Sequence, residues 1–184
     1  MKIFKSTLLA LLTCAMLCPT SFNAQAEETK VKQPEATTSL EFKNAATANK
    51  LIQNYIAALQ KGDIDAMNAQ LNEKAMIYGL GGGSDSLTVT QHKEYFTNST
   101  NQYTHTISGD LYLPLKVENN WNAGEWVLSW GTNTIKDKKT GEIIEIPYHI
   151  AALVDGGKIV WMRYFYDMLD IVQSQGFTLI PPKK

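Results

Sequence analysis

The stretch "KIVWMRYFYD", residues 158–167, decides the fold, and it holds the only arginine of the chain, Arg163. It follows the turn signal "DGG" at 155–157 and runs into a helix predicted from Met168 to Gln175, with Asp167 as its cap and Gly176 as its end. Alternation divides the strand into two faces, Val160, Met162, Tyr164 and Tyr166 against Ile159, Trp161, Arg163 and Phe165. Both faces are apolar, which is typical of a strand covered on both sides, with a dimer interface on the second face.

The same pattern of period two extends back to Tyr103 and is interrupted by turn signals at 119–120 and 139–141. It predicts four strands at about 104–118, 123–135, 142–154 and 158–166. Because the turns between them are short, we expect an antiparallel meander.

The residues before Tyr103 show helical periodicity instead. Apolar positions recur at i, i+3, i+4 and i+7 from Thr47, namely Ala48, Leu51, Ile52, Tyr55, Ile56 and Leu59. Gly62 ends this helix, and Asp63 caps a second helix that is predicted to continue through Leu71. A brief strand is expected at 76–78, and Thr90 is the expected cap of a third helix. Helices followed by a long antiparallel sheet predict an α+β domain with a pocket between the two.

The N-terminus has the pattern of an export signal. Lys2 and Lys5 precede an apolar run at 8–17, and Ala24-Gln25-Ala26 offers a cleavage site. The run is shorter than the roughly 20 residues that a membrane-spanning helix needs. Cys14 lies in a weak match to a lipid-attachment site, a less favoured alternative. We therefore expect a cleaved signal peptide at 1–26, a disordered linker at 27–44, a domain at 45–180, and a periplasmic or secreted protein without a membrane anchor.

Composition excludes several classes of function for the mature chain. Both cysteines lie in the predicted signal peptide, so disulfides, thiolate metal sites and cysteine nucleophiles are not expected. Without Lys2 and Lys5, 15 basic residues stand against 18 acidic ones, a net charge of −3 with no basic stripe for nucleic acid. The three histidines, His92, His105 and His149, lack metal-ligand spacing. We expect no cofactor and no metal.

Alternation also predicts which residues line the pocket. Ile144, Ile146, Tyr148, Ile150, Ala152 and Val154 share one face of their strand, and Glu145 and His149 lie on the other. The candidate ligand-binding residues are Tyr55, Trp126, Trp130, Tyr148, Ile150, Met162, Tyr164 and Tyr166. Pure core packing is the alternative interpretation of these aromatic residues.

Two segments resemble a known family. "DGGKIVWMRYFYDMLDIVQSQGF", residues 155–177, resembles the end of a SnoaL-like domain of the nuclear transport factor 2-like superfamily, and "ATANKLIQNYIAALQKGDIDAMNAQL", residues 46–71, resembles its first two helices. The resemblance covers roughly residues 47–177. It implies a cone-shaped, highly curved antiparallel sheet with the N-terminal helices packed across its concave face, a short C-terminal helix, and a homodimer formed through the sheet.

The resemblance also implies which positions would carry the chemistry of the family. Polyketide cyclases and limonene epoxide hydrolase place an acid/base aspartate on the last strand, where this chain has Tyr164. The histidine that supports it in cyclases falls near Ile150, with His149 one place out of phase. The aspartate base of ketosteroid isomerase falls near Tyr78 or Gly79. The catalytic residue type is absent at all three positions.

We therefore expect an exported protein that binds a small, mostly apolar molecule without established catalysis. The alternative is an enzyme of the cyclase, isomerase or dehydratase type that uses Tyr164 with Tyr148 or His149. Tyr164, with an ordinary pKa of about 10, is handicapped as a base, but a tyrosine there is able to donate a hydrogen bond to an oxyanion or a carbonyl. A third interpretation is a non-catalytic dimeric interaction module.

Overall fold

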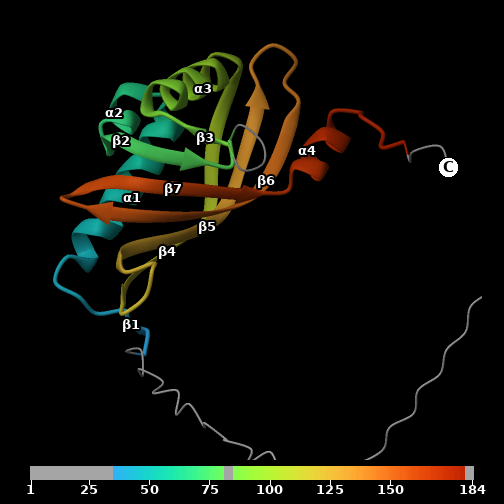
Figure 1. The fold of residues 1–184 in the computed structure, drawn as a ribbon. Coiled ribbons are helices and arrows are strands. Elements are labelled where there is room, and N and C mark those ends of the chain that lie inside the picture. Colours follow the sequence, from blue (N-terminus) through green and yellow to red (C-terminus); the bar gives the residue numbers. More distant parts are fainter. Residues whose placement is uncertain (1–34, 81–84, 181–184) are drawn as a thin grey trace, which may run out of the picture. The chain divides into compact units, whose positions relative to one another are not determined.

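The computed structural model describes residues 35–80 and 85–180, and the predicted signal peptide with Cys14 lies outside these ranges. One curved sheet has the strand order β1-β4-β5-β6-β7-β2-β3. In chain order the elements are β1 Thr37–Ser39, α1 Ala45–Lys61, α2 Ile64–Asn68, β2 Leu71–Tyr78, β3 Ser86–Leu87, α3 Val89–Gln102, β4 Tyr103–Glu118, β5 Gly124–Asp137, β6 Ile143–Asp155, β7 Lys158–Tyr166 and α4 Met168–Ser174. Figure 1 shows α1 to α3 together against one side of the sheet and α4 directly after β7.

The predicted meander is confirmed. Strands β4 to β7 pair antiparallel in sequence order, and Ile150 of β6 lies opposite Ser129 of β5 and Tyr164 of β7. The turn from β6 to β7 places Gly156 at φ 55° and Gly157 at φ 72°. Two successive residues with positive φ are the conformation that matches the twist of paired strands, and glycine adopts it without strain.

A bulge bends the sheet halfway along β4. The register shifts between Ser108 and Leu111, so β4 has one residue more than β5 at this point, and Gly109 there has φ 60°. Such an extra residue bends its strand and increases the local twist. Opposite it, Gly131 leaves room, because a Cβ at this position would lie 3.1 Å from the Tyr148 hydroxyl oxygen and 3.2 Å from the Ser108 carbonyl oxygen. The bend gives the sheet a concave face.

Strand β2 departs from the predicted arrangement in length and direction. It begins at Leu71, which we expected in the second helix, and it runs parallel to β7, so the sheet is mixed. Helix α2 ends at Asn68 because the chain then turns toward β7, where the Ile159 amide donates to the Gln70 carbonyl at 3.0 Å. Helical periodicity in the sequence does not record this pairing with a distant strand.

Helix ends follow the predicted caps with one correction. Gly62 ends α1 with φ 70°, the Asp63 carboxylate accepts from the Ala66 amide at 2.9 Å, and Asp167 caps α4. Helix α3 is capped by Thr88 rather than Thr90, because Thr88 and Gln91 form a reciprocal capping box. Among the described residues, no helix is long and apolar enough to cross a membrane.

The core lies between α1 and the concave face of the sheet. Ile52, Tyr55 and Ile56 of α1 are buried against sheet residues such as Val127 and Met162. Residues 37–39, in the segment expected to be a linker, form β1 and pair with 116–118 of β4. The predicted α+β class, with N-terminal helices on the concave face and a short C-terminal helix, is confirmed.

A close approach between β2 and β7 generates a first prediction. Gly79 has φ 86°, and a Cβ there would overlap the carbonyl oxygen of Tyr164. We expect Gly79→Ala to lower the free energy of unfolding by about 2–4 kcal/mol, because the backbone of β7 has to move and alanine is strained at this φ. Gly141→Ala is the matched control, since Gly141 has φ 78° but open space around it. It should cost only about 1 kcal/mol. Urea denaturation of both variants measures the difference, and equal costs would contradict the steric argument.

Candidate functional site

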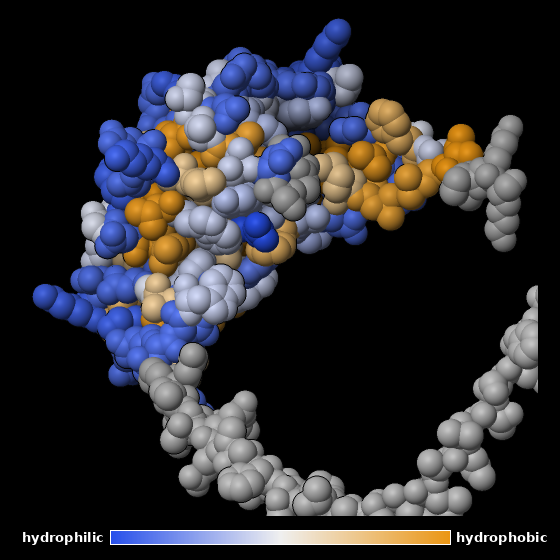
Figure 2. Space-filling view, viewed as in Figure 1, coloured by the Kyte–Doolittle hydropathy of each residue, from blue (hydrophilic) through white to orange (hydrophobic). Residues whose placement is uncertain are grey.

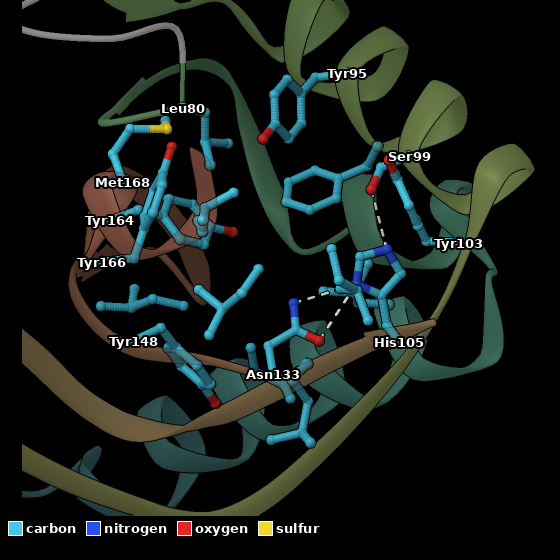
Figure 3. Close-up of a pocket in the computed structure, with 18 of the residues that line it drawn as sticks. Leu80, Tyr95, Ser99, Tyr103, His105, Asn133, Tyr148, Tyr164, Tyr166 and Met168 are labelled. Atoms are coloured by element: carbon cyan, nitrogen blue, oxygen red, sulfur yellow. Dashed lines mark hydrogen bonds between the residues drawn. The ribbon is translucent and has the colours of Figure 1, made fainter. Parts of the chain in front are cut away.

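A cavity of about 200 Å³ lies between the helices and the concave face of the sheet. Helix α3 contributes Tyr95, Phe96 and Ser99, and α4 contributes Met168 and Ile171. Figure 3 shows Tyr95 and Ser99 of α3 on one side of the cavity, across from Tyr148 and Asn133 of the sheet. Half of the remaining wall is aliphatic, with Ile56, Leu59, Leu80, Ile107, Ile135, Ile146 and Ile150, and the other half is aromatic or polar. This composition suits an apolar molecule held by a few polar groups.

Four of the predicted ligand-binding residues line this cavity. They are Tyr148 and Ile150 on β6 and Tyr164 and Tyr166 on β7. Ile150 lies directly opposite Tyr164, and Tyr148 lies opposite Tyr166. Side chains of directly opposed residues point to the same face of a sheet, so the two strands together supply one wall. Alternation in the sequence groups Tyr148 with Ile150 and Tyr164 with Tyr166, and the register between β6 and β7 brings the two pairs together.

Trp126 and Trp130 do not line the cavity, which corrects their predicted place on its wall. In the part of β5 that holds the two tryptophans, the inward positions are Val127 and Ser129, both fully buried. The reason is the register, in which Ser129 opposes Ile150 while Trp130 opposes His149. The sequence does not give the register between β5 and β6, so the two tryptophans were predicted to line the pocket because they are aromatic. In the structure their side chains lie on the opposite face of the sheet.

His149 lies on that outer face as well. Its ring stacks between those of Trp130 and Phe165, with ring centroids 4.8 and 5.5 Å away. Partial burial lowers the pKa of His149. Because it faces away from the cavity, His149 is not placed to act as an acid or base with Tyr164.

Two further predicted residues lie beneath the cavity wall rather than on it. Tyr55 and Met162 are both fully buried in the core. The inward face of β7 also differs from the prediction at its start, where Ile159 is buried and Val160 is not. A register shift between Leu153 and Val154 of β6 leaves Val160 without a partner and reverses the alternation there.

Arg163 lies on the outer face, away from Tyr164. Its guanidinium group stacks over the rings of Tyr78 and Trp161, 4.9 and 5.6 Å from their centroids. The two ion pairs found among the described residues, Lys93 with Asp65 and Lys116 with Glu118, do not involve it.

Tyr164 connects the cavity to a buried chain of hydrogen bonds. Its hydroxyl group is hydrogen-bonded to that of Tyr55, and the Tyr55 oxygen lies 2.6 Å from His92 Nε2. His92 Nδ1 lies 2.6 Å from Asn68 Oδ1, and Asn68 Nδ2 donates to the Val89 carbonyl at 3.2 Å. His92 and Asn68 were missed as candidates. The available signal was the spacing of His92 and Phe96 by four residues, which puts both on one side of α3.

Burial keeps the members of this chain uncharged. It lowers the pKa of His92 to about 4, and it raises the pKa values of Tyr55 and Tyr164 well above the ordinary value of tyrosine. Tyr148, also on the cavity wall, has its pKa raised to about 12 by burial. At neutral pH these phenols are neutral, so none of them serves as a base.

A second polar cluster lines the cavity at its β4 side. Ser99 Oγ lies 3.0 Å from His105 Nε2, and His105 Nδ1 lies 3.3 Å from Asn133 Oδ1 and 3.2 Å from Asn133 Nδ2. Burial lowers the pKa of His105. The alternation of Tyr103, His105 and Ile107 was the sequence signal for this inward histidine. Among the described residues, no group of three His, Cys, Asp or Glu side chains is arranged to hold a metal ion.

The buried histidine generates a prediction about pH. The unfolded chain protonates His92 near its ordinary pKa of 6.5 and the folded protein only near about 4, so the unfolded state binds more protons in between. Stability is therefore complete above pH 6.5 and decreases as the pH falls toward 4. We expect His92 to account for about 3 kcal/mol of this loss.

Urea denaturation of the wild type and of His92→Gln across this pH range measures the contribution. His105 and His149 shift in the same direction, so the difference between the two proteins isolates His92. Parallel pH profiles would contradict the buried neutral state of this histidine.

Comparisons with known proteins place the fold. No family model matches the chain, and no curated protein matches it in sequence. A candidate polyketide cyclase from Xanthomonas campestris pv. campestris superposes with a TM-score of 0.61 at 18% identity, over 72% of this chain and 98% of the other. An NTF2-like protein from Burkholderia xenovorans LB400 gives a TM-score of 0.54 at 16% identity, over 74% and 98%.

A ketosteroid isomerase-like protein from Erwinia carotovora atroseptica SCRI1043 gives a TM-score of 0.54 at 16% identity, over 69% of this chain and 98% of its own. Each of these proteins is covered almost completely, so the likeness extends over a whole domain. At such identities the likeness concerns architecture. The chain has the nuclear transport factor 2-like fold that its resemblance to SnoaL-like domains predicts.

Proposed function

We propose that this protein binds a small, mostly apolar molecule in the cavity between its helices and the concave face of its sheet. The observation that carries this proposal is the composition of the wall, in which aliphatic and aromatic side chains surround a few polar groups, among them the Tyr164 and Tyr148 hydroxyls and the Ser99–His105–Asn133 cluster. Such walls bind by burial of apolar surface and orient the ligand through a few hydrogen bonds.

Catalysis of the cyclase, isomerase or dehydratase type is the alternative, and the geometry gives it little support. Tyr164 occupies the position of the family aspartate, and burial raises its pKa further above neutrality. Tyr148 has its pKa raised to about 12, and His149 faces the outside of the sheet. Tyr164 and Tyr148 therefore share the cavity wall, but neither is titratable near neutral pH, and His149 does not reach the cavity.

A second hollow, of about 580 Å³, is a poorer candidate despite its size. It lies where the start of α1 meets the turn between β6 and β7, and glycines, Asn44, Glu125 and Asp155 form much of its wall. Apolar side chains there include Leu51 and Val160 but no aromatic ring. The volume is greater, but the wall offers less apolar surface on which a ligand is retained.

We propose further that the protein is exported and forms a homodimer through the outer face of its sheet. Support for export comes from the signal-peptide pattern of residues 1–26. Support for the dimer comes from Trp130 and Phe165, whose side chains are 36% and 48% exposed on the outer face, with Leu111 at 61%. Exposed aromatic and aliphatic side chains on one sheet face are typical of an interface. A purely structural dimer is the third interpretation.

Native mass spectrometry tests binding and export together when the full sequence is expressed and the protein is purified from its host. We expect the mass of a chain that begins at Glu27, together with an additional small molecule that is lost on denaturation. Ile146→Trp should reduce the bound fraction at least tenfold, because the larger side chain fills the cavity that Ile146 lines.

Ile143→Trp is the matched control for this experiment. It makes the same substitution on the same strand, but Ile143 is 58% exposed and is not part of the cavity wall. Its bound fraction should equal that of the wild type. A wild-type protein that never carries a small molecule, or an Ile146→Trp variant that retains it fully, would count against the proposed cavity.

Sedimentation analysis at micromolar concentration tests the dimer. We expect the wild type to sediment as a dimer and Phe165→Glu to sediment as a monomer, with dimerisation weakened by roughly 100-fold because a charge is buried at the interface. Trp121→Glu is the control, since Trp121 is 92% exposed in the turn between β4 and β5. A monomeric wild type would exclude the dimer through the sheet.

A further inference from the structure

The hydrogen bonds of the buried chain from Asn68 to Tyr164 all have a donor and an acceptor side. Their direction determines whether the Tyr164 hydroxyl group acts as a donor or as an acceptor toward the cavity. Asparagine, neutral histidine and tyrosine are each able to donate and to accept hydrogen bonds. A closed sequence of such groups is therefore ambiguous until one member is forced to act in one way. Here the constraint comes from the end of the chain farthest from the cavity.

The constraint is the backbone carbonyl of Val89. A carbonyl oxygen accepts and never donates, so the amide nitrogen of Asn68 must be the atom that faces it, at 3.2 Å. The other amide atom, Asn68 Oδ1, then faces His92 Nδ1 at 2.6 Å. Because this oxygen only accepts, the proton of the pair belongs to His92 Nδ1.

The next two links follow from counting protons. His92 is fully buried and burial lowers its pKa to about 4, so the neutral ring has one N–H, which lies at Nδ1. Its Nε2 atom is an acceptor and receives the hydroxyl proton of Tyr55 at 2.6 Å. Tyr55 has no second proton, so its oxygen accepts the proton of Tyr164.

We infer that Tyr164 presents its oxygen to the cavity as a hydrogen-bond acceptor only, and that the ligand is an apolar molecule carrying a hydroxyl or N–H donor. This inference rests on the proposed binding function and adds the polarity of the ligand to it. It replaces the expectation that Tyr164 donates to a carbonyl or an oxyanion, because its single proton is already used by Tyr55.

The second polar cluster does not impose such a direction. Both amide atoms of Asn133 lie at similar distances from His105 Nδ1, at 3.3 and 3.2 Å, and the hydroxyl of Ser99 is able to donate or accept. Ser99, His105 and Asn133 can therefore adapt to either kind of ligand group. The buried hydroxyl of Tyr148 on the same wall has no hydrogen-bond partner among the described residues and is also able to donate or accept. Tyr164 is the group of the wall whose direction the buried hydrogen bonds fix.

A measurement on the ligand-free protein tests the direction by itself. The nitrogen chemical shifts of a histidine ring report which nitrogen carries the proton. We expect His92 to be neutral at pH 7 with its proton on Nδ1. A proton on Nε2 would reverse the chain and overturn the inference, whether or not any ligand binds.

Three probes of similar size then test the consequence for binding, namely naphthalene, 2-naphthol and 2-methoxynaphthalene. We expect calorimetry to show 2-naphthol binding about five- to tenfold more tightly than the other two, since only its hydroxyl donates to Tyr164. In Tyr164→Phe the preference for 2-naphthol over 2-methoxynaphthalene should disappear. Binding of naphthalene without preference for 2-naphthol would overturn the inference but leave the binding function standing. Absence of binding by all three would count against the binding function itself.

A substitution of His92, which belongs to the buried hydrogen-bond chain but not to the cavity wall, should change the preference for 2-naphthol. In His92→Phe the Tyr55 proton has lost its acceptor and turns to the Tyr164 oxygen, which frees the Tyr164 proton for the ligand. The advantage of 2-naphthol over 2-methoxynaphthalene should then fall at least fivefold. Tyr78→Phe removes a phenol oxygen from the outer face and should retain the wild-type preference. Melting curves establish that each variant is folded. An unchanged preference for 2-naphthol in folded His92→Phe would contradict the inferred direction of the hydrogen bonds.

Discussion

The hydrogen bond between the hydroxyl groups of Tyr55 and Tyr164 joins helix α1 to strand β7 at the base of the cavity. Tyr55 is fully buried, so a polar atom has been taken into the core and must be satisfied there. It is satisfied on both sides, by Tyr164 and by His92. The same interaction thus locates the helix layer on the sheet, holds α3 through His92, and leaves one phenol oxygen at the cavity.

The cavity exists because the sheet is bent and the helices fill only part of its concave face. The extra residue at Gly109 and the missing side chain at Gly131 allow β4 and β5 to curve, and α1 fills only part of the resulting concave face. The space that remains is closed by α3 and by α4. Figure 2 shows that apolar residues continue over α4 and the segment after it, where Phe177, Leu179 and Ile180 are exposed.

Chemically, the cavity combines apolar walls with neutral polar groups. Burial suppresses the charged forms of His92, Tyr55 and Tyr164. A site of this kind discriminates ligands by the direction of hydrogen bonds rather than by charge, because an unmatched buried donor or acceptor costs the free energy of its lost hydration.

By itself, the sequence determined the α+β class, the helices and the antiparallel meander of β4 to β7. Period-two alternation placed Tyr148 with Ile150 on one face of β6 and Tyr164 with Tyr166 on one face of β7, since side-chain direction along a strand is a local property. The pairing of the two strands decided that these faces form one wall. Tertiary structure alone decided the parallel pairing of β2, the outward place of Trp130 and His149, and the chain from Asn68 to Tyr164. These depend on register, bulges and contacts between residues distant in sequence, which local periodicity does not encode.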